Sequence, residues 1–298
     1  MIRKKVLWSF LFTSTIVMLF SSCNQNSGKQ EEHITYGKAV MLADESLFPI
    51  IDDEYQIFVN NYKRAEIDLI YKPQQELLQL FINDSIDVAI MARNLTASEA
   101  KYFTDRKILI KPTKFAIDGI ALITGQNSQD TVISVEELNL ALKGKSKKDK
   151  TFVFDNPKSS TVEYLMNLTG VKEFPKNIYA LGSNKEVITY VNEHPDAIGI
   201  VSVAWIKRPT PDMIAQVENL KIMGVSKNKG AYEKPSQSNL KTGNYPLSRD
   251  LYLINCQGRA GLGTGFASFL AGEVGQRIIL KSGLAPDSLP GRQIRIKN

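Results

Sequence analysis

Cysteine and histidine are scarce in this chain of 298 residues, which contains two of each. The cysteines are Cys23 and Cys256, and the histidines are His33 and His194. Because Cys23 lies in the N-terminal leader described below, no pair of cysteines remains for an intrachain disulfide or a thiolate metal site. Two histidines are also too few for a catalytic or metal-binding histidine cluster. We therefore expect no metal and no cofactor.

Signatures of enzymes are missing as well. The chain has no G-x-S-x-G motif, which carries the nucleophile of many hydrolases. Its one Gly-rich stretch, GLGTGF at 261–266, lacks the lysine of a P-loop and the spacing of a dinucleotide-binding loop. We interpret this stretch as the start of a helix, and we expect a protein that is not an enzyme.

A strong excess of one charge is absent too. The formal net charge is +6, and the three basic residues at 3–5 supply half of it. The balance that remains is mild, so the composition does not indicate nucleic-acid binding. Only one long apolar run occurs, at the N-terminus, so we expect a soluble body that is anchored at one end.

The N-terminus has the composition of a secretory signal peptide. Basic residues precede the apolar stretch VLWSFLFTSTIVMLF at 6–20, and Ser-Ser-Cys follows at 21–23. These last residues resemble the lipobox of bacterial lipoproteins, in which the cysteine is lipidated. We predict a lipoprotein signal peptide at 1–22, lipidation of Cys23 and a polar tether at 23–33. An ordinary signal peptide or a single anchoring helix is the alternative.

The rest of the chain, about 275 residues, is typical of two α/β lobes. Short apolar stretches that predict strands alternate with amphipathic stretches that predict helices. The predicted strands are 34–42, 86–92, 115–125, 151–155, 197–206 and 245–255, the helices include 73–83 and 265–284, and 226–245 is predicted to be loop or hinge.

Several predicted helix starts carry the spacing of a capping box, in which a Ser or Thr precedes a Glu by three residues. Side chains in this pattern satisfy backbone N–H groups that have no partner within the helix. The pairs are Thr96–Glu99, Ser134–Glu137 and Ser160–Glu163.

The turn at Ser159, Ser160 and Thr161 has a second interpretation. Three hydroxyl groups in a row, at the positive end of a helix dipole, also form a site that suits an anion. Capping and anion binding are compatible roles, and the motif alone does not decide between them.

Seven segments within residues 38–286 together resemble the segments of a known protein family. They are ADESLFP, DVAIMARNLTASE, DGIALITG, DNPKSST, AIGIV, YPLSRDLYLI and FASFLAGEVGQRIILKSGLAP. In this order they resemble segments of the substrate-binding proteins of phosphate ABC transporters.

The resemblance implies an α/β protein with a type II periplasmic-binding-protein fold. In this fold two lobes, joined by two hinge crossovers, close on a ligand in the cleft between them. We place the crossovers near 113–117 and 243–247. The first lobe is then formed by 34–115 with 246–298, and the second lobe by 116–245.

The resemblance also implies a ligand-binding set. Ser46 and the backbone N–H of Leu47 match a donor loop, and Ala92 stands where many members have Ser. Arg93 matches an Arg of the family, although a structural ion pair is the alternative for it. The full predicted set is Ser46, Leu47, Ala92, Arg93, Asp155, Lys158, Ser159, Ser160 and Thr161.

Asp155 departs from the family, which usually has an Arg there that pairs with phosphate. A carboxylate in this place repels a dianion. Three accounts are open: Asp155 accepts a proton of monoprotonated phosphate, it pairs with Arg93 and orients it, or the ligand is not phosphate. Lys158 is the candidate for the missing positive charge. Asp118 is expected to support the hinge or to form a structural pair.

These features predict an extracytoplasmic solute-binding lipoprotein of the bacterial cell envelope, lipid-anchored, facing the periplasm and monomeric. It would capture inorganic phosphate or a related oxyanion and deliver it to an ABC transporter permease. The alternatives are the same fold with a different oxyanion or small anion as ligand, and an envelope scaffold that binds no small molecule.

Overall fold

The computed structural model describes residues 33–83, 86–146, 150–228 and 230–288. The predicted signal peptide, the lipidation site Cys23 and nearly all of the predicted tether lie outside the described residues. Within the part of the chain that is described, no helix has the length and apolar character needed to cross a membrane.

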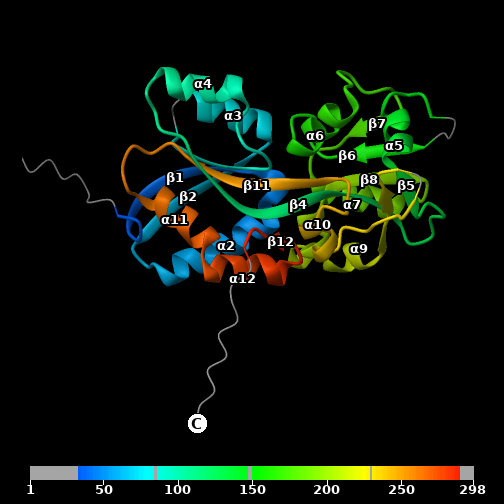
Figure 1. Ribbon diagram of the computed structural model, residues 1–298. Coiled ribbons are helices and arrows are strands. Elements are labelled where there is room, and N and C mark those ends of the chain that lie inside the picture. Colours follow the sequence, from blue (N-terminus) through cyan, green and yellow to red (C-terminus); the bar gives the residue numbers. More distant parts are fainter. Residues whose placement is uncertain (1–32, 84–85, 147–149, 229, 289–298) are drawn as a thin grey trace, which may run out of the picture. The chain divides into compact units, whose positions relative to one another are not determined.

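The protein has a mixed α/β fold built on a curled sheet of ten strands (Figure 1). Neighbouring strands are parallel except where β11 and β4 meet their neighbours in the middle of the sheet. The order is β2 (Ala65–Lys72), β1 (Gly37–Asp44), β3 (Val88–Met91), β11 (Ser248–Asn255), β4 (Lys111–Gly125), β8 (Ala197–Ser202), β6 (Thr151–Phe154) and β7 (Ile178–Ala180), while β9 (Leu220–Ile222) and β12 (Ala285–Pro286) also pair with β4.

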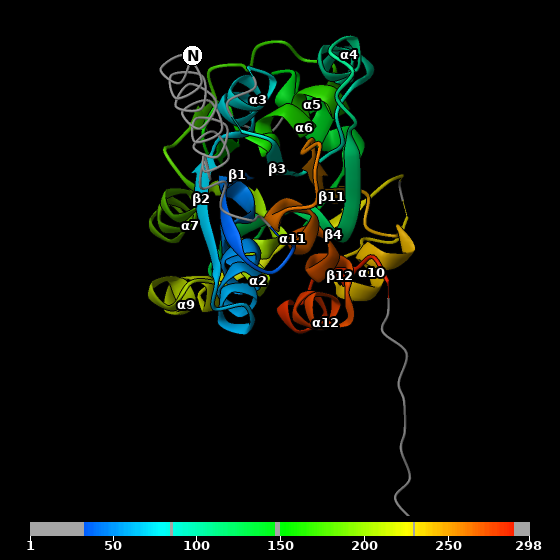
Figure 2. The ribbon, with the colours of Figure 1, turned by 90° about the vertical axis from the view of Figure 1, so that its left-hand side faces the viewer.

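Helices flank this sheet, as Figures 1 and 2 show, and a separate pair of strands lies beside it. The separate strands are β5 (Val132–Ser134) and β10 (Gly224–Ser226). The helices are α2 (Phe48–Asn61), α3 (Gln74–Ile82), α4 (Ala97–Asp105), α5 (Val135–Leu142), α6 (Ser160–Thr169), α7 (Asn184–Glu193), α8 (Val203–Lys207), α9 (Ile214–Glu218), α10 (Gln237–Thr242), α11 (Leu262–Ala271) and α12 (Glu273–Ser282), with short 3-10 turns η2 (Glu45–Leu47) and η3 (Pro211–Met213).

Strand β4 joins the two lobes of the fold. It pairs with β11 from Lys111 to Gly119 and with β8 from Ile120 to Ile123. Strands β1, β2, β3 and β11 therefore lie on one side of β4, and β6, β7 and β8 on the other. The second connection, just before β11, is tied to the same strand, because the hydroxyl of Tyr245 donates to the carbonyl of Ile120 over 2.7 Å. The lobe limits given above remain a prediction.

Many of the predicted elements are present, and local signals explain why. Strands β3 and β8 are buried along their whole length, as expected for strands covered on both faces. The capping boxes Thr96–Glu99 and Ser134–Glu137 start α4 and α5 with both reciprocal hydrogen bonds.

Three predicted elements differ from the structure. The closing stretch 265–284 is two helices, because the backbone at Gly272 is extended and ends α11 before α12 begins. The predicted strand 197–206 ends at Ser202, whose hydroxyl accepts from the N–H of Ala204 and so starts α8. The predicted loop 226–245 contains α10.

A carboxyl group is buried without a partner on α2. The side chain of Glu54 is 0% exposed, and neither of its oxygens has a hydrogen-bond partner among the described residues. Burial, reinforced by the charge of Asp53, raises the pKa of Glu54 to about 9. The folded protein therefore keeps this carboxyl neutral at pH 7, whereas the unfolded chain ionises it.

The substitution Glu54→Gln is expected to stabilise the protein at neutral pH. Between pH 4.5 and the folded pKa of about 9, the folded state binds one proton more than the unfolded state. The free energy of unfolding of the wild type therefore falls by about 1.4 kcal/mol per pH unit from this group. Urea unfolding at pH 5 and pH 7.5 should show the advantage of E54Q growing by about 3 kcal/mol.

The matched control is Glu66→Gln, since Glu66 is exposed and pairs with Lys38 at the surface. Its effect should be small and nearly independent of pH. If the difference between E54Q and the wild type stays constant with pH, Glu54 is ionised in the folded protein and the prediction is wrong.

Candidate functional site

A buried polar cluster lies where the two lobes meet. Its first part is the turn η2 at the end of β1, where the carboxylate of Asp44 accepts from the N–H of Ser46 over 3.0 Å. Asp44, Ser46 and Leu47 are fully buried. Strand β1 therefore places the hydroxyl of Ser46 inside the protein rather than at its surface.

The second part of the cluster is the start of α6. Ser159 is the N-cap, since its hydroxyl accepts from the N–H of Val162 over 3.2 Å. The predicted capping box of Ser160 with Glu163 is therefore wrong: Ser160 is already helical, and its hydroxyl has other partners. By helix geometry, the amides of Ser160 and Thr161 have no partner within the helix.

The hydroxyls of the two lobes meet directly. Ser46 Oγ and Ser160 Oγ are 2.9 Å apart, although 114 residues separate them in the sequence. Thr161 is fully buried as well, and its hydroxyl has no partner among the described residues. The hydroxyl-rich turn thus faces the donor loop of the other lobe.

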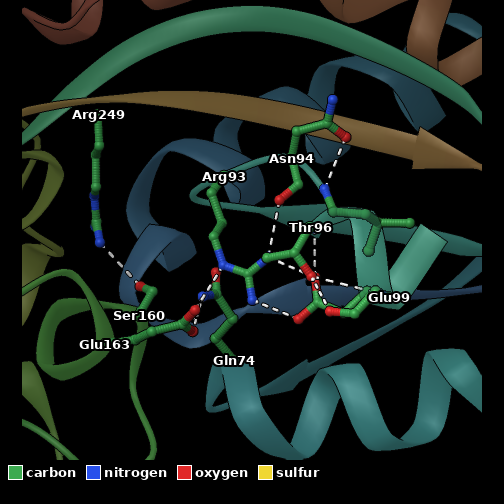
Figure 3. Close-up of polar contacts among 10 residues, drawn as sticks. Gln74, Arg93, Asn94, Thr96, Glu99, Ser160, Glu163 and Arg249 are labelled. Atoms are coloured by element: carbon green, nitrogen blue, oxygen red, sulfur yellow. Dashed lines mark hydrogen bonds and ion pairs between the residues drawn. The ribbon is translucent and has the colours of Figure 1, made fainter. Parts of the chain in front are cut away.

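Arg249 on β11 holds these groups together. Its guanidinium donates to Ser160 Oγ over 2.9 Å and to Ser46 Oγ over 3.1 Å. Its Nε donates to Asp118 Oδ2 over 2.9 Å, and Asp118 also accepts from Ser202. The side chain of Arg249 is only 3% exposed, so this is a buried ion pair. Figure 3 shows Arg249 pointing toward Ser160.

Sequence reasoning missed Arg249 as a site residue, although the segment YPLSRDLYLI contains it. The signal was its position in the strand. Residues 249, 251 and 253 of β11 are buried, while 248, 250 and 252 are partly exposed. A charged residue in phase with the buried leucines of an alternating strand indicates a buried partner or ligand.

Asp155 is buried beside the N-cap of α6. Its carboxylate accepts from Ser159 Oγ over 2.6 Å and from the amide of Asn184 over 2.9 Å. Burial raises the pKa of Asp155 to about 7, and the nearby charge of Asp44 adds to this although Arg249 opposes it. Asp155 is thus poised to gain or lose a proton near neutral pH.

Asp44 shows the same tendency, since burial raises its pKa despite the opposing charge of Arg249. One oxygen of Asp44 and one of Asp118 have no partner among the described residues. The cluster therefore combines three carboxyl groups with one guanidinium, and it offers both donors and buried acceptors. Such a set suits a small oxyanion that still carries a proton.

Arg93 lies near the cluster, but its donors are directed to two carboxylates and to the backbone carbonyl of Asn94. Its Nε donates to Glu163 over 2.7 Å, and its two terminal nitrogens donate to Glu99 over 2.8 Å each (Figure 3). Glu163 also accepts from the amide of Gln74. The structural ion pair considered for Arg93 is present, and it joins α6 to the other lobe. Its role toward a ligand remains a prediction.

Two other predicted site residues, Lys158 and Ala92, lie outside the buried polar cluster. Lys158 pairs with Glu76 over 3.0 Å, and its side chain is 56% exposed. The buried positive charge of the cluster is therefore that of Arg249. Ala92 is nearly buried and contributes a methyl group to the cavity described below. Across the residues that the structure describes, no group of acidic, histidine or cysteine side chains is arranged to hold a metal ion.

The sequence matches a known protein family over most of its length. Residues 28–274 match the family described as a PBP superfamily domain, which covers most of the chain. The chain belongs to this family.

Relatives of this PBP superfamily protein include phosphate-binding proteins. The phosphate-binding protein PstS of Staphylococcus aureus is 21% identical over 260 residues, which cover 83% of this chain and 77% of the relative. A structure of a phosphate ABC transporter substrate-binding protein with bound phosphate, from Clostridium perfringens, is 17% identical, with a TM-score of 0.71 over 85% of this chain and 100% of its own. An ABC-type phosphate transport receptor from Vibrio cholerae is 20% identical with a TM-score of 0.65, over 84% and 100%.

These likenesses confirm the predicted fold class and the resemblance on which it was based. The structures share the fold at low identity, so they do not by themselves assign a ligand to this chain.

Proposed function

We propose that the protein captures inorganic phosphate between its lobes and delivers it to an ABC transporter. The observation that carries the proposal is the buried guanidinium of Arg249, which bridges Ser46 of one lobe and Ser160 of the other. A planar guanidinium, two hydroxyls and the first amides of α6 are donors that suit a tetrahedral oxyanion. The phosphate-binding relatives support this choice of ligand.

In this proposal only some of the predicted ligand residues contact the ion directly, and the others support the site or lie at its edge. Ser46, Leu47, Ser160 and Thr161 supply hydroxyls or amides from the two facing turns. Ser159, whose hydroxyl and amide have partners within its own turn, holds Asp155 in place. Asp155 accepts a proton of the bound ion, and Arg249 supplies the charge that Asp155 does not. Ala92, Arg93 and Lys158 lie at the edge of the site.

The proposal includes the cellular setting. The protein is a lipoprotein anchored through Cys23, facing the periplasm and acting as a monomer without catalysis. The order of basic, apolar and small residues at the N-terminus supports the anchor. Delivery to a transporter rests on the relatives that are named as transport proteins.

Calorimetric titration tests the proposal. The full-length protein in detergent, unfolded and dialysed to remove carried-over ligand and then refolded, should bind phosphate at pH 8 with micromolar or tighter affinity. Asp155 is ionised at this pH and sulfate has no proton to give to it, so sulfate should bind at least about tenfold more weakly. Displacement of phosphate by sulfate or molybdate would support the different-oxyanion alternative, and absence of any anion binding would support the scaffold alternative.

A further inference from the structure

A cavity of about 310 Å³ reaches the buried cluster. Ser160 and Arg249, which are hydrogen bonded to each other, form part of its wall. The same wall continues along α6 through Tyr164, Asn167 and Leu168. Tyr164 follows Ser160 by four residues, and Asn167 and Leu168 follow Tyr164 by three and four, so these positions lie on one face of the helix.

The size of this cavity exceeds what inorganic phosphate fills. Small-molecule sites usually have volumes of about 300–1,000 Å³. Phosphate has five heavy atoms, so an ion held at Ser160 and Arg249 leaves most of the cavity for another part of the ligand.

The cavity wall opposite α6 comes from the other lobe. It is formed by Gln74 at the start of α3 and by Ala92 and Arg93 after β3. Figure 3 shows Gln74 and Arg93 beside Glu163 of α6. Gln74 is only 1% exposed, and its amide nitrogen donates to Glu163. Its amide oxygen has no partner among the described residues. A buried acceptor without a partner costs free energy, which a hydrogen-bond donor on a ligand removes.

Apolar groups line the same space. The methyl group of Ala92 lies on one side, and Leu168 lies on the α6 side. Carbon atoms, rather than charged oxygens, suit these contacts.

We infer that the cleft accepts an oxyanion with a small hydroxyl-bearing organic substituent, as in a phosphomonoester or a phosphonate. The oxyanion head contacts Ser160 and Arg249, the carbon atoms pass Ala92 and Leu168, and a hydroxyl donates to the oxygen of Gln74. This inference rests on the proposed function, because the head group uses the same donors.

Calorimetry on the full-length protein tests the inference with three probes: inorganic phosphate, glycerol 3-phosphate and propyl phosphate. Glycerol 3-phosphate should bind at least about tenfold tighter than phosphate, since one additional buried hydrogen bond is worth roughly that factor. Propyl phosphate, which has the carbon chain without hydroxyls, should lie between the two.

Two variants address the wall of the cavity. Gln74→Met removes the amide acceptor and should narrow the preference for glycerol 3-phosphate over phosphate by about tenfold. Leu168→Trp fills the cavity and should weaken glycerol 3-phosphate more than phosphate. The matched control is Leu280→Trp on α12, because Leu168 and Leu280 are exposed to 36% and 39%.

The outcomes separate this inference from the proposed function. If phosphate binds as tightly as glycerol 3-phosphate, or more tightly, the inference is overturned and the proposed function stands. If neither binds, both are overturned. A preference for glycerol 3-phosphate that survives both cavity variants overturns the assignment of the substituent to this cavity.

Discussion

The substitution Arg249→Met is expected to abolish phosphate binding and to destabilise the protein. Arg249 is the buried cation that contacts both Ser46 and Ser160, so its loss removes the donors that bridge the lobes. Truncation of one member of a buried hydrogen-bonded charge pair weakens binding by about a hundredfold or more. It also leaves Asp118 buried and uncompensated, which costs about 3–5 kcal/mol of stability.

Loss of stability alone does not explain the expected loss of binding, and two further variants show this. Arg249→Lys keeps the charge but lacks the planar fork, so it should fold and still bind phosphate at least about tenfold more weakly. The double variant R249M/D118N removes both members of the ion pair, and it should recover part of the stability of R249M but none of its binding.

Calorimetry at pH 6.5 and urea unfolding give the two measurements. Arg208→Met is the matched control, since Arg208 pairs with Asp53 at the surface and its side chain is 55% exposed. That variant should bind phosphate normally and lose about 1 kcal/mol of stability or less. Phosphate binding by R249M at wild-type affinity would show that the ligand lies elsewhere.

The role of Arg249 also shows where sequence reasoning stops. Signals that act within a few residues were sufficient for much of the fold. The Thr96–Glu99 and Ser134–Glu137 pairs start helices because each pair is complete within one turn. Buried strands such as β3 are recognisable because both of their faces are apolar.

Ser160 shows the limit of the same reasoning. It has the spacing of a capping residue, yet its hydroxyl bonds to Ser46 and Arg249, which are 114 and 89 residues away in the sequence. The N-cap of α6 is therefore Ser159, one residue before the cap that the sequence predicts. A local pattern cannot report a partner that only the fold brings into contact.

The break between α11 and α12 has a similar origin. The apolar pattern continues through Gly272, but a side chain at Gly275 would approach the carbonyl oxygen of Phe269 to within 2.4 Å of its Cβ. The two helices therefore pack too closely for any residue but glycine at 275. Close packing of this kind is a property of the folded chain and not of its hydrophobic periodicity.

The second large effect concerns Asp155, for which the sequence left three accounts open. The account in which Asp155 orients Arg93 has no support in the structure, because the described contacts of Arg93 are with Asn94, Glu99 and Glu163. The account in which Asp155 accepts a proton fits its burial and its pKa of about 7.

Sulfate binding is therefore expected to weaken as the pH rises above 7, whereas phosphate binding is not. The proposed complex holds one proton between Asp155 and the bound ion. Above the pKa of about 7 the free carboxylate has lost this proton; monoprotonated phosphate brings its own, whereas binding of sulfate must take one up from solvent. The sulfate affinity then falls by up to about tenfold per pH unit from this group.

Asp155→Asn should remove this dependence. The asparagine amide donates to the ion instead of accepting its proton, so the variant prefers ligands without a proton to give. We expect sulfate to gain about tenfold in affinity or more at pH 8, and to keep the same affinity between pH 7 and 8 where it loses affinity with the wild type. Sulfate does not titrate in this range, so the difference between the two proteins reports the titration of Asp155.

The control is Asp105→Asn, which removes an exposed carboxylate paired with Lys101 and should leave both affinities unchanged. A third result is informative too. If D155N weakens phosphate by the same factor at pH 6, 7 and 8, then Asp155 acts only by holding Ser159 and Asn184 in place. The proton would then have another acceptor, and Asp44, with its raised pKa and one oxygen without a described partner, is the carboxyl group to substitute next.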